Sequence, residues 1–156
     1  MRFVTIPIFV SGLALSQVAL PAGGQSVETT IASSTDLRSR LVLAHRLDAP
    51  GLRNLKDLLA ASSWNSESKA YHEAHLRLRL SEVLKRTECN EAEAEVDQAI
   101  QILESCSDGE SLALLGACYI QKMGLSWSSR MTLGSRSGKI FTLAQKQAPN
   151  NPRVLG

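Results

Sequence analysis

Apolar residues recur every three or four positions along most of this chain, the spacing that places them on one face of a helix. The pattern predicts six helices, over about 36–47, 51–62, 66–86, 90–105, 108–123 and 135–148. No segment alternates convincingly between apolar and polar residues with a period of two, as a half-buried strand would. We therefore expect an all-α fold.

Polar side chains that accept hydrogen bonds from the first turn of a helix mark where the helices should begin. The expected caps are Thr35 or Asp36, Ser66, Asn90 and Asp108. In the third helix, the expected core positions are Ala70, Ala74, Leu76, Leu80, Val83 and Leu84. Residues 124–134 begin and end with glycine, and we expect them to form a long loop or distorted turn.

The N-terminal segment has the pattern of an export signal. Arg2 gives a positive start, residues 3–20 are almost all apolar or small, and Ala22 and Gly24 provide a small-x-small cleavage site. The expected divisions are a signal peptide over 1–24, a flexible leader over 25–34 and a helical domain over 35–156. This predicts a periplasmic or secreted protein without stable membrane insertion. The alternative is an uncleaved anchor, although two prolines interrupt the apolar run.

Charge and composition narrow the function classes. The formal net charge is +2, and we interpret the two signs as alternating along the helices, so no nucleic-acid partner is expected. Aromatic residues make up only 4% of the chain, which favours closely packed helices over strands. Cys89 and Cys106 are separated by a predicted helix roughly 25 Å long, beyond disulfide reach. We expect these two thiols and Cys118 to be unpaired and buried.

Two of the expected helices share the same spacing of a small, a large and a small residue. The three residues are Ala92, Val96 and Ala99 in the fourth helix, and Ser137, Phe141 and Ala144 in the sixth. In the fifth helix, Gly116 allows a neighbouring helix to approach closely, and Tyr119 follows one turn later. Pro149 should end the sixth helix.

This arrangement resembles the helix pairs of tetratricopeptide repeats, with units over 67–105 and 110–149. It is more similar still to a group of small exported bacterial tetratricopeptide-like proteins with an enlarged inner loop and no established activity. The resemblance implies a right-handed array of antiparallel helical hairpins that offers a concave groove to a protein or peptide. About nine residues more than a regular unit holds separate Gly116 from Ala144, and we assign them to 124–134.

The last residues, 150–156, resemble the entry to a further helix. We expect an array that is truncated at this end, or one whose end a partner covers, because helical repeats bury their open ends. Phe141, Leu143, Val154 and Leu155 would then lie on an uncovered face that promotes self-association.

Three fragments of catalytic or ligand-binding motifs are incomplete. His72 and His75 are three residues apart, whereas the zinc-protease helix needs two histidines four apart and a third ligand. Ser66 and Lys69 match a Ser-x-x-Lys motif, but the other elements of that active site are missing. Residues 134–139 lack the spacing and the following Ser or Thr of a phosphate loop. We therefore expect no enzyme activity, no metal and no cofactor.

The best candidate binding residues lie between the fifth and sixth helices. Trp127, Arg130 and Met131 are residue types that concentrate at binding hot spots, and we add Tyr119 as a fourth candidate. The alternative is that Trp127 folds back over Leu125 and serves packing only. Trp64, between the second and third helices, offers the same choice.

These observations favour a non-enzymatic interaction scaffold. The alternative function is a small-molecule carrier or accessory enzyme with a pocket beneath residues 124–134. A ligand that orders this segment would favour the carrier, whereas capture of peptides would favour the scaffold.

Overall fold

The computed structural model describes residues 33, 36–37, 39 and 48–155. Nearly all of the expected signal peptide and leader, and most of the expected helix over 36–47, lie outside these residues. The helices are α2 (Ala49–Ala61), α3 (Ser66–Leu84), α4 (Cys89–Leu103), α5 (Gly109–Leu125), α6 (Arg130–Gln147) and α7 (Pro152–Leu155). The described part of the chain contains no strand, and none of its helices is long and apolar enough to cross a bilayer.

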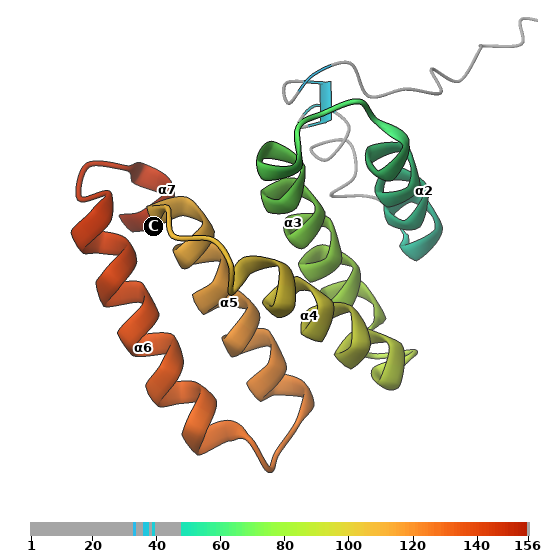
Figure 1. The fold of residues 1–156 in the computed structure, drawn as a ribbon. Coiled ribbons are helices and arrows are strands. Elements are labelled where there is room, and N and C mark those ends of the chain that lie inside the picture. The colour runs from blue at the N-terminus through green and yellow to red at the C-terminus, as the bar shows by residue number, and fades with distance from the viewer. Residues whose placement is uncertain (1–32, 34–35, 38, 40–47, 156) are drawn as a thin grey trace, which may run out of the picture.

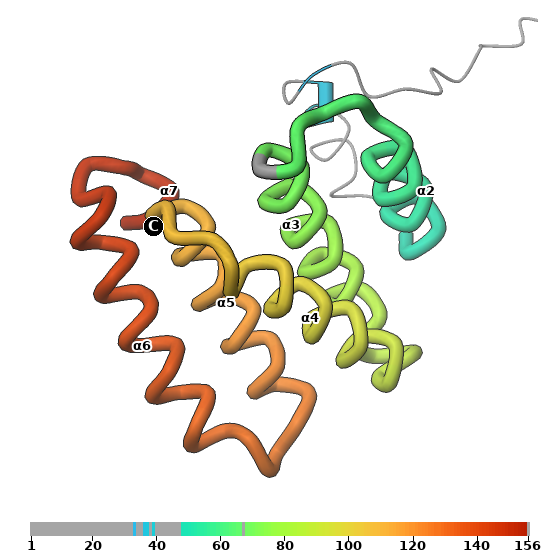
Figure 2. Tube along the Cα trace, in the orientation of Figure 1, coloured from blue at the N-terminus to red at the C-terminus, as the bar shows by residue number. Residues whose placement is uncertain are grey.

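The helices form an array of antiparallel hairpins, which confirms the expected all-α class. Figure 1 shows α3 and α4 as one hairpin and α5 and α6 as the next, with α2 beside α3 and α7 at the end of the second hairpin. In the tube of Figure 2, the chain turns back between successive helices from α2 to α6, each of which packs against the next. The order of the helices in space therefore follows their order in the sequence.

Two helices begin at acidic caps. The Asp108 carboxylate accepts a hydrogen bond from the Ser111 backbone N–H at 2.9 Å, which confirms Asp108 as the start of α5. At α2, Asp48 accepts from the Gly51 N–H at 3.2 Å, and Pro50 occupies the first turn, where its missing N–H costs nothing.

Two of the remaining expected caps, Ser66 and Asn90, are wrong by one or two residues. Asn65 caps α3 by accepting from the Ser68 N–H at 2.8 Å, so Ser66 is the first helical residue. α4 begins at Cys89, after Glu88, without a side-chain cap, and Asn90 lies inside its first turn. Asn65 and Glu88 are polar, as are the expected caps Ser66 and Asn90. Residue type alone therefore does not show which of several nearby polar residues precedes the helix.

The long loop expected over 124–134 is not present. α5 continues to Leu125 and α6 begins at Arg130, so the extra residues lengthen both helices and the connection is short. None of the described glycines has positive φ, and Gly124 and Gly134 are helical. A Cβ atom at Gly134 would lie 3.5 Å from the Met123 sulfur, an ordinary packing distance, so the approach of the two helices does not require glycine here.

The third helix of the sequence pattern, α3, is buried on two sides. Leu76, Leu80 and Leu84 pack in a cluster with α2, whereas Leu78 packs in a second cluster with α4, α5 and α6. The expectation that Val83 is a core residue is wrong, because this side chain is 42% exposed.

The expected close contact between α5 and α6 is confirmed at Gly116. A Cβ atom at this position would lie 2.8 Å from Cζ of Phe141, and the Ser137 hydroxyl donates a hydrogen bond to the Gly116 carbonyl at 3.2 Å. Ala144 is completely buried further along α6, and the helix ends at Gln147, two residues before Pro149.

Ion pairs tie α2 and α3 to α4. The carboxylate of Glu95, which is buried, accepts hydrogen bonds from Lys56 at 2.5 Å and from Arg77 at 2.7 Å. Arg77 also pairs with Glu73 on its own helix. Since these groups are shielded from water, each charge depends on its partners.

The expectation of an uncovered apolar face is wrong for Phe141, which is half-buried with its ring against Gly116 of α5. It is also wrong for Val154. This side chain is buried, in a cluster with Leu112, Ala113 and Ala144, because α7 folds back onto α5 and α6. An ion pair of 2.8 Å between Arg153 and Glu110 holds α7 in place.

All three cysteines are free, as expected, but they are not all buried. Cys118 is buried, Cys106 is half-buried and Cys89 is exposed at the start of α4. Burial, and to a smaller extent the charge of Glu82, raises the pKa of the Cys118 thiol to about 12. This thiol therefore stays protonated and unreactive at neutral pH.

Candidate interaction surface

The turn between α5 and α6 presents three of the expected binding residues to solvent. We call Trp127, Arg130 and Met131 the turn cluster. Trp127 is 77% exposed and Met131 is 91% exposed, so Trp127 does not fold back over Leu125. Figure 1 shows that this turn forms the end of the second hairpin opposite to α7. The turn cluster is thus an accessible group of two large apolar side chains and one cation.

Contacts within the turn hold Trp127 and Arg130 of the cluster in a defined arrangement. The guanidinium carbon of Arg130 lies 4.1 Å from the centre of the Trp127 ring, a cation–π contact. Nε of Arg130 also donates to the Met123 carbonyl at 3.0 Å, near the end of α5. Arg130 thereby links the tryptophan ring to the helix backbone, so part of the conformational entropy lost on binding is already lost in the free protein.

Tyr119 does not belong to this surface. It is only 3% exposed, and its hydroxyl donates to the Glu104 carboxylate at 3.2 Å. Burial raises the pKa of Tyr119, although the positive charge of Arg136, 5.4 Å from the ring centre, acts in the opposite direction. Tyr119 is a core residue between α4, α5 and α6, and its assignment as a binding residue is corrected.

A hollow of about 320 Å³ lies on the side of α5 that faces α4 and the first half of α6. Leu133 is the one residue of the described segment 124–134 that lines this hollow, so it only partly matches the pocket expected beneath that segment. Lys122 pairs with Asp97, and Arg136 lies 3.9 Å from Glu104. Because these charges already have partners within the protein, a charged ligand would have to displace existing ion pairs.

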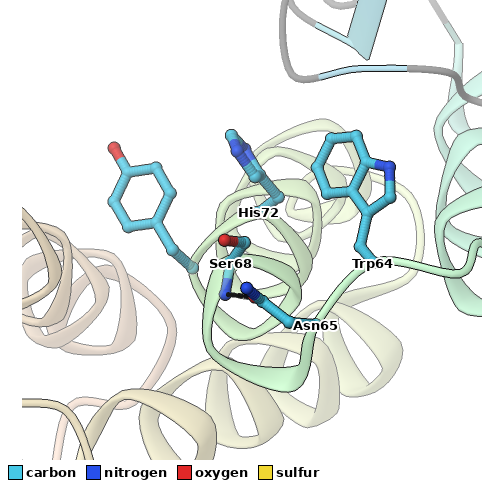
Figure 3. Close-up of a pocket in the computed structure, with 5 residues that line it drawn as sticks. Trp64, Asn65, Ser68 and His72 are labelled. Carbon is cyan, nitrogen blue, oxygen red and sulfur yellow. Dashed lines mark hydrogen bonds between the residues drawn. The ribbon is translucent and has the colours of Figure 1, made fainter.

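A larger hollow, of about 420 Å³, lies at the start of α3 and was not expected from the sequence. Figure 3 shows Trp64 and His72 beside each other over the helix end, above the hydrogen bond from Ser68 to Asn65. The Trp64 and His72 rings meet edge to face, with their centres 5.4 Å apart, and the centres of the Tyr71 and His72 rings are 5.3 Å apart. Ser68, Tyr71 and His72 are three and four residues apart, a spacing that places them on one side of a helix. This spacing is the signal in the sequence that could have indicated the hollow.

The interpretation of Trp64 as a packing residue agrees with its contacts. Trp64 is half-buried and packs against the cluster between α2 and α3. His75 lies one turn beyond His72, with its ring 6.3 Å from that of Tyr71. Within the described residues, no group of three or more His, Cys, Asp and Glu side chains is placed to hold a metal ion. His45, the third histidine, lies outside those residues.

Charges are not mixed along every helix, contrary to the expectation from the sequence. Between its ends, α4 contains four acidic residues and no cation, whereas α6 contains four cations and no acidic residue. The four acidic residues are Glu91, Glu93, Glu95 and Asp97, and the four cations are Arg130, Arg136, Lys139 and Lys146. The whole-chain charge of +2 conceals this separation.

Comparison with known proteins finds no matching family model, no matching curated protein and no matching solved structure. The function is therefore argued from the residues and geometry of this chain.

Proposed function

We propose that this protein is an exported, non-enzymatic interaction scaffold that binds a protein or peptide through the turn cluster. The observation that carries the proposal is the exposure of Trp127 and Met131 beside an ordered arginine. Exposed tryptophan is costly to leave in water, and tryptophan and arginine are the residue types most enriched where binding energy concentrates.

The rest of the structure supports a scaffold role. Hairpin arrays present side chains from rigid helices, and their terminal turns can enter a partner's pocket without refolding. The proposal includes the tetratricopeptide-like character inferred from the spacing around Gly116 and Ser137. Export is proposed from the pattern of residues 1–24, which lie outside the described part of the chain.

Site-specific cross-linking in cells that express the full chain tests the proposal. A photoreactive residue at Met131 should yield adducts with a protein, whereas the same residue at the exposed Gln98 on α4 should not. With the partner purified, Trp127→Ala should weaken binding by at least about tenfold, the effect of losing a hot-spot side chain. Equal adducts at both positions, or affinity within about twofold after Trp127→Ala, would exclude the turn cluster as the binding site.

A further inference from the structure

We propose that the outer face of α6 binds an acidic amphipathic helix of the partner protein. This inference rests on the proposed function and specifies the chemistry of the partner. The outer face consists of the exposed positions Met131, Ser135, Lys139, Thr142 and Lys146. These positions follow the spacing of three and four residues that defines one side of a helix, opposite to the buried Leu133, Ser137 and Ala144.

The acidic helix α4 is neutralised by cations on the helices that pack around it. Cations from three other helices meet its carboxylates: Arg53 and Lys56 of α2, Arg77 of α3 and Lys122 of α5. Glu91 pairs with Arg53 at 2.7 Å, and the pKa of Glu91 is held below its usual value chiefly by that hydrogen bond. A helix with four acidic residues is thus packed among helices that supply the opposite charge.

The basic helix α6 has the opposite charge but lacks equivalent neighbours. Arg130 is engaged with Trp127, and Arg136 lies at the limit of ion-pair distance from Glu104. Among the described residues, no carboxylate lies within ion-pair distance of Lys139 or Lys146. Two cations on the outer face therefore remain available to a partner's carboxylates.

The spacing of these groups fits a helix better than it fits a membrane surface. Lys139 and Lys146 are seven residues apart, so they lie about 10 Å apart along one side of α6. Leu143, 43% exposed, lies beside them, and Met131, at the start of the outer face, belongs to the turn cluster. A partner helix with carboxylates two turns apart and apolar residues between them matches this pattern. A membrane-surface helix needs a broad apolar face, whereas Ser135 and Thr142 occupy the centre of this one.

A displayed library of amphipathic helical peptides, about 20 residues long, tests the inference with the full chain as bait. The polar positions of the library are randomised among Glu, Gln and Lys. We expect enriched peptides to be rich in Glu, and their affinity, measured by fluorescence anisotropy, to fall as salt is added. Lys139→Gln combined with Lys146→Gln should weaken binding by at least about threefold, since two exposed ion contacts are lost.

A matched variant controls for net charge. Asn54→Asp combined with Gln98→Glu lowers the formal charge by the same two units, from +2 to 0, at exposed positions of α2 and α4. This control should bind the acidic peptides within about twofold of the parent, because it leaves the outer face unchanged.

The outcomes separate this inference from the proposed function. Peptides that lose affinity with Trp127→Ala, but are not acidic or ignore the lysine variant, would overturn the inference and leave the scaffold proposal standing. Acidic peptides that depend on both lysines but ignore Trp127→Ala would support the inference and refute the turn cluster as the anchor. Absence of enriched peptides would overturn the inference and leave the scaffold proposal to be decided by the cross-linking experiment. Lysine-dependent binding to vesicles of phosphatidylglycerol and phosphatidylcholine, with no peptide binding, would also overturn the inference.

Discussion

Replacement of Gly116 by leucine tests the contact between α5 and α6 most directly. A Cβ atom at this position would lie 2.8 to 2.9 Å from three ring carbons of Phe141. Carbon atoms pack best at about 3.5 to 4.0 Å, so the ring or the helix must move by roughly an ångström. The hydrogen bond from Ser137 to the Gly116 carbonyl couples the two backbones and opposes such a movement.

Two effects of opposite sign determine the magnitude. Overpacking a close helix contact costs about 1 to 3 kcal/mol, and the added leucine atoms place this change near the upper end. Leucine is a better helix former than glycine, which offsets the loss by just under about 1 kcal/mol. We therefore expect Gly116→Leu to lower the free energy of unfolding by about 2 kcal/mol, measured by urea unfolding and circular dichroism of the full chain.

A double-mutant cycle with Phe141→Ala isolates the clash. In the Phe141→Ala background the obstacle is gone, so Gly116→Ala should stabilise the protein by about 1 kcal/mol through helix propensity. In the parent the same substitution should bring no such gain. If Gly116→Leu leaves stability unchanged or higher, or if Gly116→Ala has the same effect in both backgrounds, the contact does not limit the approach of the helices.

Four further predictions concern single positions. Glu95→Gln should lower the free energy of unfolding by about 2 to 3 kcal/mol, since it leaves the shielded Lys56 without its carboxylate and Arg77 with Glu73 alone; a loss under about 0.5 kcal/mol would show that water screens these cations. Asp108→Ala should cost about 1 kcal/mol at pH 7. Burial opposes ionisation of Asp108, but hydrogen bonds from Ser111 lower its pKa overall, so its contribution should be present above about pH 4 and lost as the pH falls through the folded-state pKa. Unfolding of Asp108→Ala and its parent across an acid pH series checks this: the difference between them should shrink as the pH falls, and a difference that does not change with pH contradicts it. A thiol reagent at pH 8 should modify Cys89 in the native protein and Cys118 only after denaturation; mass spectrometry of peptides distinguishes the two, and native labelling of Cys118 would show that α5 opens readily. Leu143→Lys should change stability by less than about 0.5 kcal/mol because the side chain is half exposed, and a melting temperature well below that of the parent would show that this position is packed.

The candidate site could be named in part from the sequence. Trp127, Arg130 and Met131 were selected by residue type and by their position between two helices, and the structure places them together at an exposed turn. Tyr119 was selected by the same reasoning but lies in the core. The two cases differ because local sequence shows where a residue lies along a helix but not whether another helix covers it.

Charge separation shows a second limit. Whole-chain balance hid the opposite charges of α4 and α6, although counting residues helix by helix would have found them. Even that count would not have shown which charges are satisfied. Lys122 finds Asp97 across a helix interface, whereas Lys139 and Lys146 face outward, and this distinction depends on where each helix packs.

The sequence by itself determined the helices and one contact between them. Caps such as Asp108 and the spacing of apolar residues are local signals that act within three or four positions. They can therefore be recognised in the sequence without knowledge of the fold. The close helix contact at Gly116 was also predicted, because close helix approach requires a small residue whatever the surrounding structure, whereas the structure identified Phe141 as the residue opposite it.

Only the tertiary structure decided which faces are covered. Leu78 is buried and Val83 exposed on the same helix, since α3 packs between α2 on one side and α4 and α5 on the other. Likewise, Gly124 and Gly134 are helical beside Leu125 and Leu133, which pack against other helices, although glycine alone favours a break. A side chain is buried only when another helix packs over it. The sequence of one helix therefore shows which residues could be buried, but not which neighbouring helix will cover them.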